Sequence, residues 1–179
     1  MIITGASGIV GRHFIETAKE EFFIYAIARR SQEESEIPPH PNIKWVQVDI
    51  SNFNALRSVI VNTLVKSSST PQSPQAPQAS PAEPTDDIDF VLHLASYYDF
   101  DYKDHPEYQR TNIQGTRNIL EISRQLKGKR FVFSSSVAAA RFPSRGGKIT
   151  EETPVDADHP YAVSKKAGEK MVREYSQFF

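Results

Sequence analysis

Short apolar runs alternate with stretches of helical periodicity along most of this chain. The apolar runs predict strands near Met1–Thr4, Phe22–Ala28, Ile43–Val48, Phe90–His93 and Arg130–Ser134. The periodic stretches predict helices near Ile9–Glu20, Asn54–Val65, Glu107–Leu126 and Tyr161–Phe179. This alternation is typical of an α/β fold in which crossover helices connect parallel strands. The second, fourth and fifth strands are nearly uninterrupted apolar runs, so we expect both of their faces to be covered.

One segment does not follow this pattern. Residues 67–87 read SSSTPQSPQAPQASPAEPTDD and are rich in Pro, Ser and Gln. Because such a composition buries too little apolar surface to offset its ordering entropy, we expect a disordered insertion before the fourth strand. The alternative is a ligand for a proline-recognising domain, but no basic residue lies beside a PxxP sequence.

The composition narrows the class of protein. The 179 residues carry 21 basic and 22 acidic side chains, a net charge of −1 and no cysteine. We therefore expect no nucleic-acid or membrane partner, no disulfide framework and no metal site. The longest apolar runs have the length of strands, and Met1 leads directly into one of them. The default is a cytoplasmic protein that acts on a small-molecule substrate.

A glycine-rich turn, Gly5-Ala-Ser-Gly8-Ile-Val-Gly11, stands between the first strand and the first helix. In this context glycines permit a tight turn and let a pyrophosphate approach the helix N-terminus. We expect a dinucleotide there, with a hydrogen bond from Ser7; the alternative is a glycine turn without a ligand. The candidate cofactor residues of this segment are Gly5, Ser7, Gly8, Ile9, Val10 and Gly11.

The end of the second strand indicates which dinucleotide. NAD enzymes with this arrangement place an acidic residue there to bind the adenosine ribose, whereas this chain has Arg29 and Arg30. Two guanidinium groups can bind a 2′-phosphate, so we expect NADP as the preferred cofactor and keep NAD as the alternative. Arginines that only solvate the loop are the other interpretation.

Tyr161 and Lys165 lie four residues apart and share one face of the last predicted helix. A nearby ammonium favours the ionised form of a phenol, whose ordinary pKa is about 10, and so makes a general acid/base. The serines at positions 134–136 end the fifth strand, and a hydroxyl there could hold a carbonyl or alkoxide oxygen. Hydride transfer is the natural use of such a set.

At these residues the chain resembles the short-chain dehydrogenase/reductase superfamily, in particular its extended branch of NAD(P)-dependent epimerase/dehydratase and dihydroflavonol-reductase-like enzymes. The motifs that carry this resemblance, in the order in which the family has them, are TGASGIVG (4–11), DI (49–50), HLAS (93–96), TNIQGT (111–116), FVFSSS (131–136) and YAVSK (161–165). The resemblance implies a Rossmann-type doubly wound parallel sheet with strand order 3-2-1-4-5. It also implies a nicotinamide cofactor and a catalytic Ser-Tyr-Lys set.

The resemblance assigns further roles. It implies that Ser136 faces the substrate, with Ser135 as the fallback, and that Lys165 also binds the nicotinamide ribose. Asp49 matches an adenine-contacting aspartate, although a turn aspartate is the plain alternative. Asn112 matches a family asparagine that either supports the site or takes part directly. The cofactor residues implied in this way are Asp49, Ile50, Leu94, Ala95, Ser96, Asn112, Tyr161 and Lys165.

The substrate is less well indicated. Sugar-nucleotide epimerases of the family often follow the serines with a hydroxylated residue and a Tyr-Gly pair, but this chain has Ala138 and no such pair. The sequence therefore favours a reductase or dehydrogenase that acts on a less polar carbonyl or alcohol. Aromatic residues in 97–102 either form a wall for that substrate or pack against other chain. An epimerase or dehydratase is the alternative, and a non-catalytic NADP-binding redox sensor or scaffold is the alternative of another class.

The chain stops inside the predicted catalytic helix, where family members continue. We therefore expect residues 1–179 to be a truncated NAD(P)-binding domain, without the C-terminal substrate-binding part and inactive by itself. A homodimer through the helices that include 105–126 and 161–179 is a further expectation.

Overall fold

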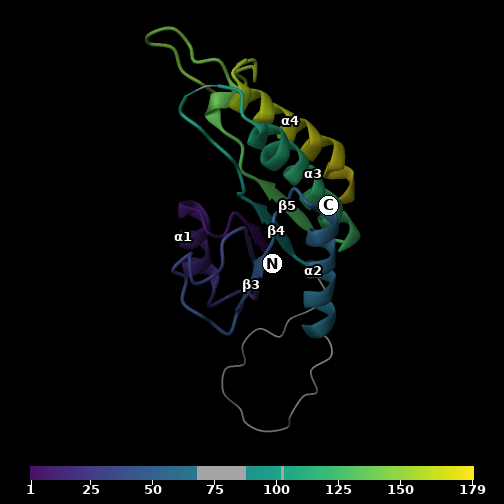
Figure 1. The fold of residues 1–179 in the computed structure, drawn as a ribbon. Coiled ribbons are helices and arrows are strands. Elements are labelled where there is room, and N and C mark those ends of the chain that lie inside the picture. Colours follow the sequence, from purple (N-terminus) through teal and green to yellow (C-terminus); the bar gives the residue numbers. More distant parts are fainter. Residues whose placement is uncertain (68–87, 102) are drawn as a thin grey trace, which may run out of the picture.

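A parallel sheet of five strands runs through the molecule, which is seen here in a computed structural model that describes residues 1–67, 88–101 and 103–179 (Figure 1). The strands lie in the order β3-β2-β1-β4-β5, and every neighbouring pair is parallel. This order confirms the predicted Rossmann-type topology. Of the expected insertion at 67–87, Ser67 is instead the last residue of helix α2, and residues 68–87 lie outside the described part, as does residue 102. The strands are β1 (Ile2–Thr4), β2 (Ile24–Ala28), β3 (Ile43–Gln47), β4 (Phe90–His93) and β5 (Arg130–Phe133).

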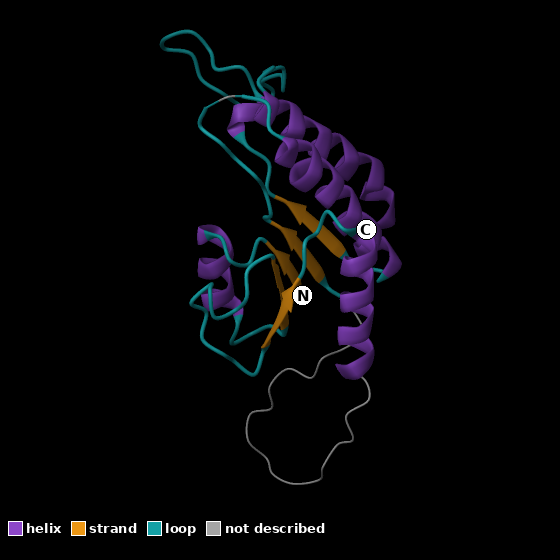
Figure 2. Cartoon of the chain, in the orientation of Figure 1, coloured by secondary structure: helices purple, strands orange, loops and turns teal. Residues whose placement is uncertain are grey.

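Helices cover both faces of the sheet. Helix α1 lies on one face, and α2, α3 and α4 lie on the other (Figure 2). Three shorter helical segments, η1 to η3, connect or extend them. The bounds are α1 (Ile9–Ala18), α2 (Phe53–Ser67), η1 (Tyr108–Gly115), α3 (Thr116–Gln125), η2 (Val137–Ala139), α4 (Pro160–Tyr175) and η3 (Ser176–Phe178).

Alternation along the strands divides the core into two layers. Ile2, Ile27 and Val91 share a buried cluster with Leu56 of α2 and Ile119 of α3. Their strand neighbours point the other way, because successive strand side chains face opposite sides of a sheet, and form a second buried cluster under α1. That cluster contains Ile3, Ala6, Ile15, Ala18, Ile24, Ala26, Ala28 and Ile37. The two layers fix the strand ends that form the carboxyl edge of the sheet.

The expectation that β5 is covered on both faces is wrong. Leu92 of β4 still reaches the cluster under α1, but its register partner Val132 is 43% exposed. The α1 layer therefore ends at β4. β5 is the last strand of the sheet in the described residues, and its apolar run reflects burial on one side only.

The predicted helix near Glu107–Leu126 is also two different helices. Residues 108–115 form a π-helix, and only the part from Thr116 onward is α-helical. Hydrophobic periodicity does not separate the two forms, because the difference is one residue per turn. Gly115 fits this segment closely against the turn after β3, since a Cβ there would lie 2.7 Å from Cδ1 of Ile50.

The other predicted elements hold, with shifts at their ends. α1 stops at Ala18, and β2 begins at Ile24 instead of Phe22. α4 ends at Tyr175 and is followed by a short 3₁₀ segment. In the described part of the chain, no helix is long and apolar enough to cross a membrane.

Candidate functional site

The glycine-rich turn brings three backbone segments into very close contact. Gly5 has φ +70°, a left-handed conformation, and a Cβ on it would lie 2.7 Å from the backbone nitrogen of Ala95. A Cβ on Gly11 would lie 2.3 Å from the carbonyl oxygen of Gly5. Only glycine fits at these two positions without displacing backbone. The turn therefore brings the backbones of β1, the end of β4 and the start of α1 into direct contact.

The turn leaves the N-terminus of α1 open to an anion. Gly8 is the N-cap residue and offers no side-chain hydrogen bond, and the first turn of the helix holds no acidic residue. The first N–H groups of a helix and its dipole favour negative charge at this position. The arrangement fits the pyrophosphate of a dinucleotide.

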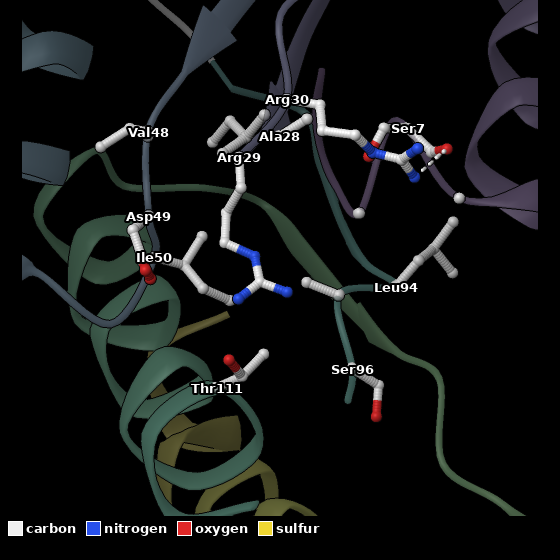
Figure 3. Close-up of a pocket in the computed structure, with 14 residues that line it drawn as sticks. Ser7, Ala28, Arg29, Arg30, Val48, Asp49, Ile50, Leu94, Ser96 and Thr111 are labelled. Atoms are coloured by element: carbon white, nitrogen blue, oxygen red, sulfur yellow. Dashed lines mark hydrogen bonds between the residues drawn. The ribbon is translucent and has the colours of Figure 1, made fainter. Parts of the chain in front are cut away.

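A cavity of about 460 Å³ lies over this turn, along the carboxyl ends of β1 to β4 (Figure 3). Ligands of open α/β sheets bind at this edge, where the strand order reverses. The lining comes from four strand ends and from η1. It consists of Gly5, Ser7, Gly8, Ile27, Ala28, Arg29, Arg30, Val48, Asp49, Ile50, Leu94, Ala95, Ser96 and Thr111.

The two arginines after β2 point in different directions. Arg30 turns toward the glycine-rich turn, where its Nη2 donates to the carbonyl oxygen of Ser7 at 3.5 Å (Figure 3). Arg29 extends across the cavity toward Thr111, and its Nη1 donates to Oε2 of Glu107 at 2.9 Å. The pair therefore does not converge on one point.

Asp49, at the end of β3, has partners on both carboxylate oxygens. Its Oδ1 accepts hydrogen bonds from the backbone N–H and the hydroxyl of Ser51, at 2.9 Å and 2.7 Å, and its Oδ2 pairs with Arg110. Burial raises the pKa of the Asp49 carboxyl, but the Ser51 bonds and the charges of Arg110 and Arg29 outweigh it and hold that pKa below its ordinary value. Asp49 is thus an ionised carboxylate at the cavity wall.

Tyr161 stands near the start of α4, beyond the cavity. Aromatic rings surround it: Tyr98 meets it edge-on at 4.6 Å between ring centroids, and Tyr108 and His159 lie at 6.3 Å. The His159 side chain accepts a bond from the N–H of Ala162 and so caps α4. Because the other ring nitrogen of His159 lies 3.2 Å from the carbonyl oxygen of Ala138, the cap also ties α4 to the segment after β5.

Lys165 lies one turn further along α4 and is only 4% exposed. Its Nζ donates to the carbonyl oxygen of Ser134 at 2.9 Å and lies 5.7 Å from the centre of the Tyr161 ring. Burial lowers the pKa of the Lys165 ammonium to about 8, while the charge of Glu169 raises it. The predicted proximity of Tyr161 and Lys165 on one helix face is therefore present in the structure.

The three serines after β5 have three different contacts. The backbone of Ser134 holds Lys165, and the hydroxyl of Ser135 donates to Glu169 of α4 at 2.5 Å. Ser136 accepts the N–H of Ala138 at 3.2 Å and caps η2. A hydroxyl that accepts one bond can still donate its proton. Because the Ser135 proton is already donated to Glu169 whereas the Ser136 proton is not, Ser136 is the better candidate for the hydroxyl that faces a substrate.

A buried chain of hydrogen bonds joins the glycine-rich turn to η1. The hydroxyl of Thr4 lies 2.6 Å from Nδ1 of His93, and Nε2 of His93 lies 2.8 Å from the hydroxyl of Thr116. Since Thr116 donates to the carbonyl oxygen of Asn112 at 2.6 Å, Nε2 of His93 carries the proton and donates to Thr116. Burial, helped by the charge of Lys165, lowers the pKa of His93 to about 3, so the ring is neutral. The neutral ring thus links β1 to the start of α3 within the core.

Asn112 is buried, and its amide bonds within the protein. Its Oδ1 accepts the N–H of Tyr97 at 2.7 Å, and its Nδ2 donates to the carbonyl oxygen of Tyr97 and to Ser164, each at 2.9 Å. The amide thus links the loop after β4 to α4. These contacts fit the alternative in which Asn112 supports the site.

The predicted cofactor residues divide into two groups. Ten of them line the cavity: Gly5, Ser7, Gly8, Arg29, Arg30, Asp49, Ile50, Leu94, Ala95 and Ser96. The others lie beside it: Ile9 and Val10 are 72% and 64% exposed at the start of α1. Gly11, Asn112, Tyr161 and Lys165 are not among the residues that line it. Whether all of them contact a cofactor stays a prediction.

Sequence reasoning missed some of the wall. Val48 and Thr111 line the cavity, and Glu107 holds Arg29 from behind it. Thr111 directly precedes the motif asparagine Asn112, and Glu107 lies one helical turn before Thr111. This spacing was the signal that could have found both residues.

Comparisons with known proteins show relatives of this chain. A putative UDP-glucose 4-epimerase of Methanocaldococcus jannaschii is 22% identical over all of this chain and 52% of its own length. A putative dihydroflavonol 4-reductase of Synechocystis is 26% identical over 86% of this chain and 38% of its own length. The chain thus spans about half the length, or less, of these curated relatives.

A solved structure gives the same fold. Uronate dehydrogenase from Agrobacterium tumefaciens, a variant crystallised with NAD, superposes with a TM-score of 0.72 at 22% identity, over 99% of this chain and 56% of that protein. The model of the NAD dependent epimerase/dehydratase family matches residues 77–179, which is more than half of the chain. Together with the glycine turn and the Tyr161–Lys165 pair, this match shows that the chain belongs to the NAD dependent epimerase/dehydratase family.

Proposed function

We propose that this chain supplies the cofactor site and the proton-transfer groups of an NAD(P)-dependent oxidoreductase that acts on a carbonyl or alcohol. The observation that carries the proposal is the position of Lys165, whose Nζ is held by Ser134 after β5 and lies 5.7 Å from the centre of the Tyr161 ring. The cavity over the glycine-rich turn supports it. Bound nicotinamide would supply or accept the hydride. The protein's own groups then have to hold one oxygen and move one proton.

Tyr161 is the proposed acid/base. It donates its phenol proton to the carbonyl oxygen as that oxygen becomes an alkoxide, or accepts a proton from an alcohol in the reverse direction. The Ser136 hydroxyl donates a hydrogen bond to the same oxygen and so stabilises its developing charge. Lys165, 5.7 Å from the Tyr161 ring, is buried, so its charge acts on the phenol with little screening by water.

Our proposal for the cofactor is NADP rather than NAD. The absence of a carboxylate at the end of β2 supports it, as does the presence of Arg29 and Arg30 on the cavity wall. A charge-assisted hydrogen bond to a 2′-phosphate favours NADPH by about 1.5–3 kcal/mol. Titration of the purified chain with each cofactor, followed by fluorescence, should give NADPH at least tenfold tighter binding. Equal affinities would contradict the NADP preference.

An epimerase of sugar nucleotides is the second candidate, and the named activity of several relatives supports it. The two candidates differ in the fate of the cofactor. A reductase consumes one NADPH for each carbonyl reduced, whereas an epimerase interconverts two sugars without net cofactor use. Stoichiometric loss of NADPH absorbance with a carbonyl substrate would support the first, and equilibration of a UDP-sugar with its 4-epimer would support the second.

Self-association through α3 and α4 is also a proposal. Val163 of α4 and Phe178 of η3 are 47% and 48% exposed, which supports an apolar contact along these helices. Sedimentation of the purified chain tests it, with Val163→Asp and Phe178→Asp expected to shift the distribution toward monomer. Sedimentation as a monomer at every concentration would overturn it.

A further inference from the structure

Four charged side chains form one connected set at the adenosine end of the cavity. Arg29 pairs with Oε2 of Glu107 at 2.9 Å, and Arg110 pairs with Oε1 of the same carboxylate. Arg110 also pairs with Asp49 at the end of β3. The hydroxyl of Thr111 donates to Oε2 of Glu107 at 2.6 Å. Glu107 is therefore the centre of the set, with a hydrogen-bonding partner on each oxygen.

Burial within the set is uneven. The side chain of Glu107 is 13% exposed, whereas the side chains of Arg29 and Arg110 are 55% and 50% exposed. The hydrogen bond from Thr111 lowers the pKa of Glu107 more than burial raises it, and Arg110 and Arg29 lower it further. A shielded, ionised carboxylate thus holds two arginines whose outer faces are open to solvent.

The position of Glu107 matters because of what Arg29 faces. Glu107 is not among the residues that line the cavity, whereas Arg29, Thr111 and Asp49 all are. Arg29 reaches across the cavity toward Thr111 because its partner stands behind that wall (Figure 3). A 2′-phosphate that approached Arg29 would therefore meet a guanidinium whose charge Glu107 already offsets. Arg30 contacts the carbonyl oxygen of Ser7 and forms no ion pair within the described residues. Its charge also acts on the exposed Glu34 carboxylate, but as the last of the causes that lower the pKa of that group.

We propose that Glu107 is a selectivity residue for the cofactor, which holds and neutralises Arg29 and leaves recognition of a 2′-phosphate to Arg30. This inference rests on the proposed function, since it concerns the same dinucleotide site. Glu107 acts through Arg29 and is a positioning residue. Its effect is to lower the affinity for NADPH and so to limit the preference for NADP over NAD.

The first measurement is the ratio of NADH to NADPH dissociation constants in the purified chain, by fluorescence titration. Glu107→Gln keeps the side-chain shape and removes the charge, so it should raise the affinity for NADPH about 5- to 10-fold, the scale of one ion pair. The affinity for NADH should change less than about 2-fold. Thr111→Val should act in the same direction with a smaller effect.

A double-mutant cycle tests the route through Arg29. In the unmodified chain Arg29→Gln should weaken NADPH binding less than about 3-fold, and Arg30→Gln should weaken it about 10-fold or more. In the Glu107→Gln background the released Arg29 should bind phosphate, so Arg29→Gln should then cancel the whole gain. Glu121→Gln on α3 is the matched control, since it removes an equal charge from a carboxylate paired with Arg124, away from the cavity.

The outcomes separate this inference from the proposed function. An unchanged ratio in Glu107→Gln, or additive effects in the cycle, would overturn the role of Glu107 while leaving a dinucleotide site. A comparable change in Glu121→Gln would also overturn it, because net charge alone would then explain the effect. Failure of the chain to bind either cofactor would overturn the proposed function and this inference together.

Discussion

The carboxyl edge of the sheet is formed differently at its two ends. At the cofactor end, backbone approaches backbone: Gly5 and Gly11 have no room for a side chain, and Arg29, Arg30 and Asp49 stand on the wall of an open cavity. At the catalytic end, side chains hold side chains, with Lys165 fixed by Ser134 and Tyr161 enclosed by aromatic rings. The first end suits the proposed dinucleotide, and the second holds the proposed acid/base groups in place. Substitutions should therefore affect binding and turnover separately.

The largest expected effect is at the catalytic end. In an active preparation, Tyr161→Phe should lower turnover about 10²- to 10⁴-fold and leave cofactor affinity nearly unchanged, because only the proton-transferring oxygen is removed. Steady-state kinetics and cofactor titration measure the two quantities. Tyr175→Phe, on the same helix, should leave both unchanged. Normal turnover in Tyr161→Phe would show that the phenol is not the acid/base.

Gly11→Ala should show the opposite pattern at the cofactor end. The added Cβ would lie 2.3 Å from the carbonyl oxygen of Gly5, and neither backbone can move away easily. We expect a loss of about 3 kcal/mol in the free energy of unfolding, measured with urea, together with loss of cofactor binding. The control is Gly128→Ala, where the nearest atom would be 3.4 Å away. Equal stability of the two variants would mean that the turn can widen.

Acid should lower the free energy of unfolding of the chain through His93. The pKa of His93 is about 3 in the folded chain and about 6.5 when exposed, so between these values the unfolded state binds more protons. The stability from this group is complete above pH 6.5 and falls as the pH decreases, by about 2 kcal/mol from pH 7 to pH 5. Urea unfolding at both pH values measures it. In His93→Gln the loss of stability from pH 7 to pH 5 should be smaller by this contribution of His93. An equal loss in the variant and the unmodified chain would show that His93 does not cause it.

The smallest expected effect concerns Glu169. Its charge raises the pKa of Lys165, so Glu169→Gln should let Lys165 lose its proton at a lower pH. The alkaline decrease of turnover in an active preparation should then begin at lower pH, with a change of a few-fold at neutral pH. Glu174→Gln removes a carboxylate of the same helix that pairs with Lys170 and serves as the control. Identical pH profiles for all three proteins would exclude this tuning.

Much of the cofactor end could be predicted because its determinants are local. The glycine spacing predicts where the backbone turns. The strand pattern alone predicts that the residues after β2 and β3 lie at the carboxyl edge of the sheet. The contact between Arg29 and Glu107 could not be predicted, because it joins positions 78 residues apart and depends on how η1 lies against the sheet. The open face of β5 was missed for a similar reason, since an apolar run does not show which neighbours cover it.

The catalytic end was predictable in its residues more than in its contacts. Helical spacing alone places Tyr161 and Lys165 together. It does not show that the hydroxyl of Ser135 turns to Glu169, or that the amide of Asn112 is occupied by Tyr97 and Ser164. Such choices depend on the packing of α4 against η1, which forms only in the folded chain.

The π-helix of η1 places stability and function in opposition. A helix with wider turns forms hydrogen bonds of poorer geometry, and deletion of one residue, such as Gln109, would allow the ordinary α-helical form. That change should strengthen the helix itself while it rotates Asn112 away from Tyr97. Selection for heat resistance alone would accept such a deletion, whereas selection for activity would reject it. The wider helix thus holds Asn112 where its amide joins the loop after β4 to α4.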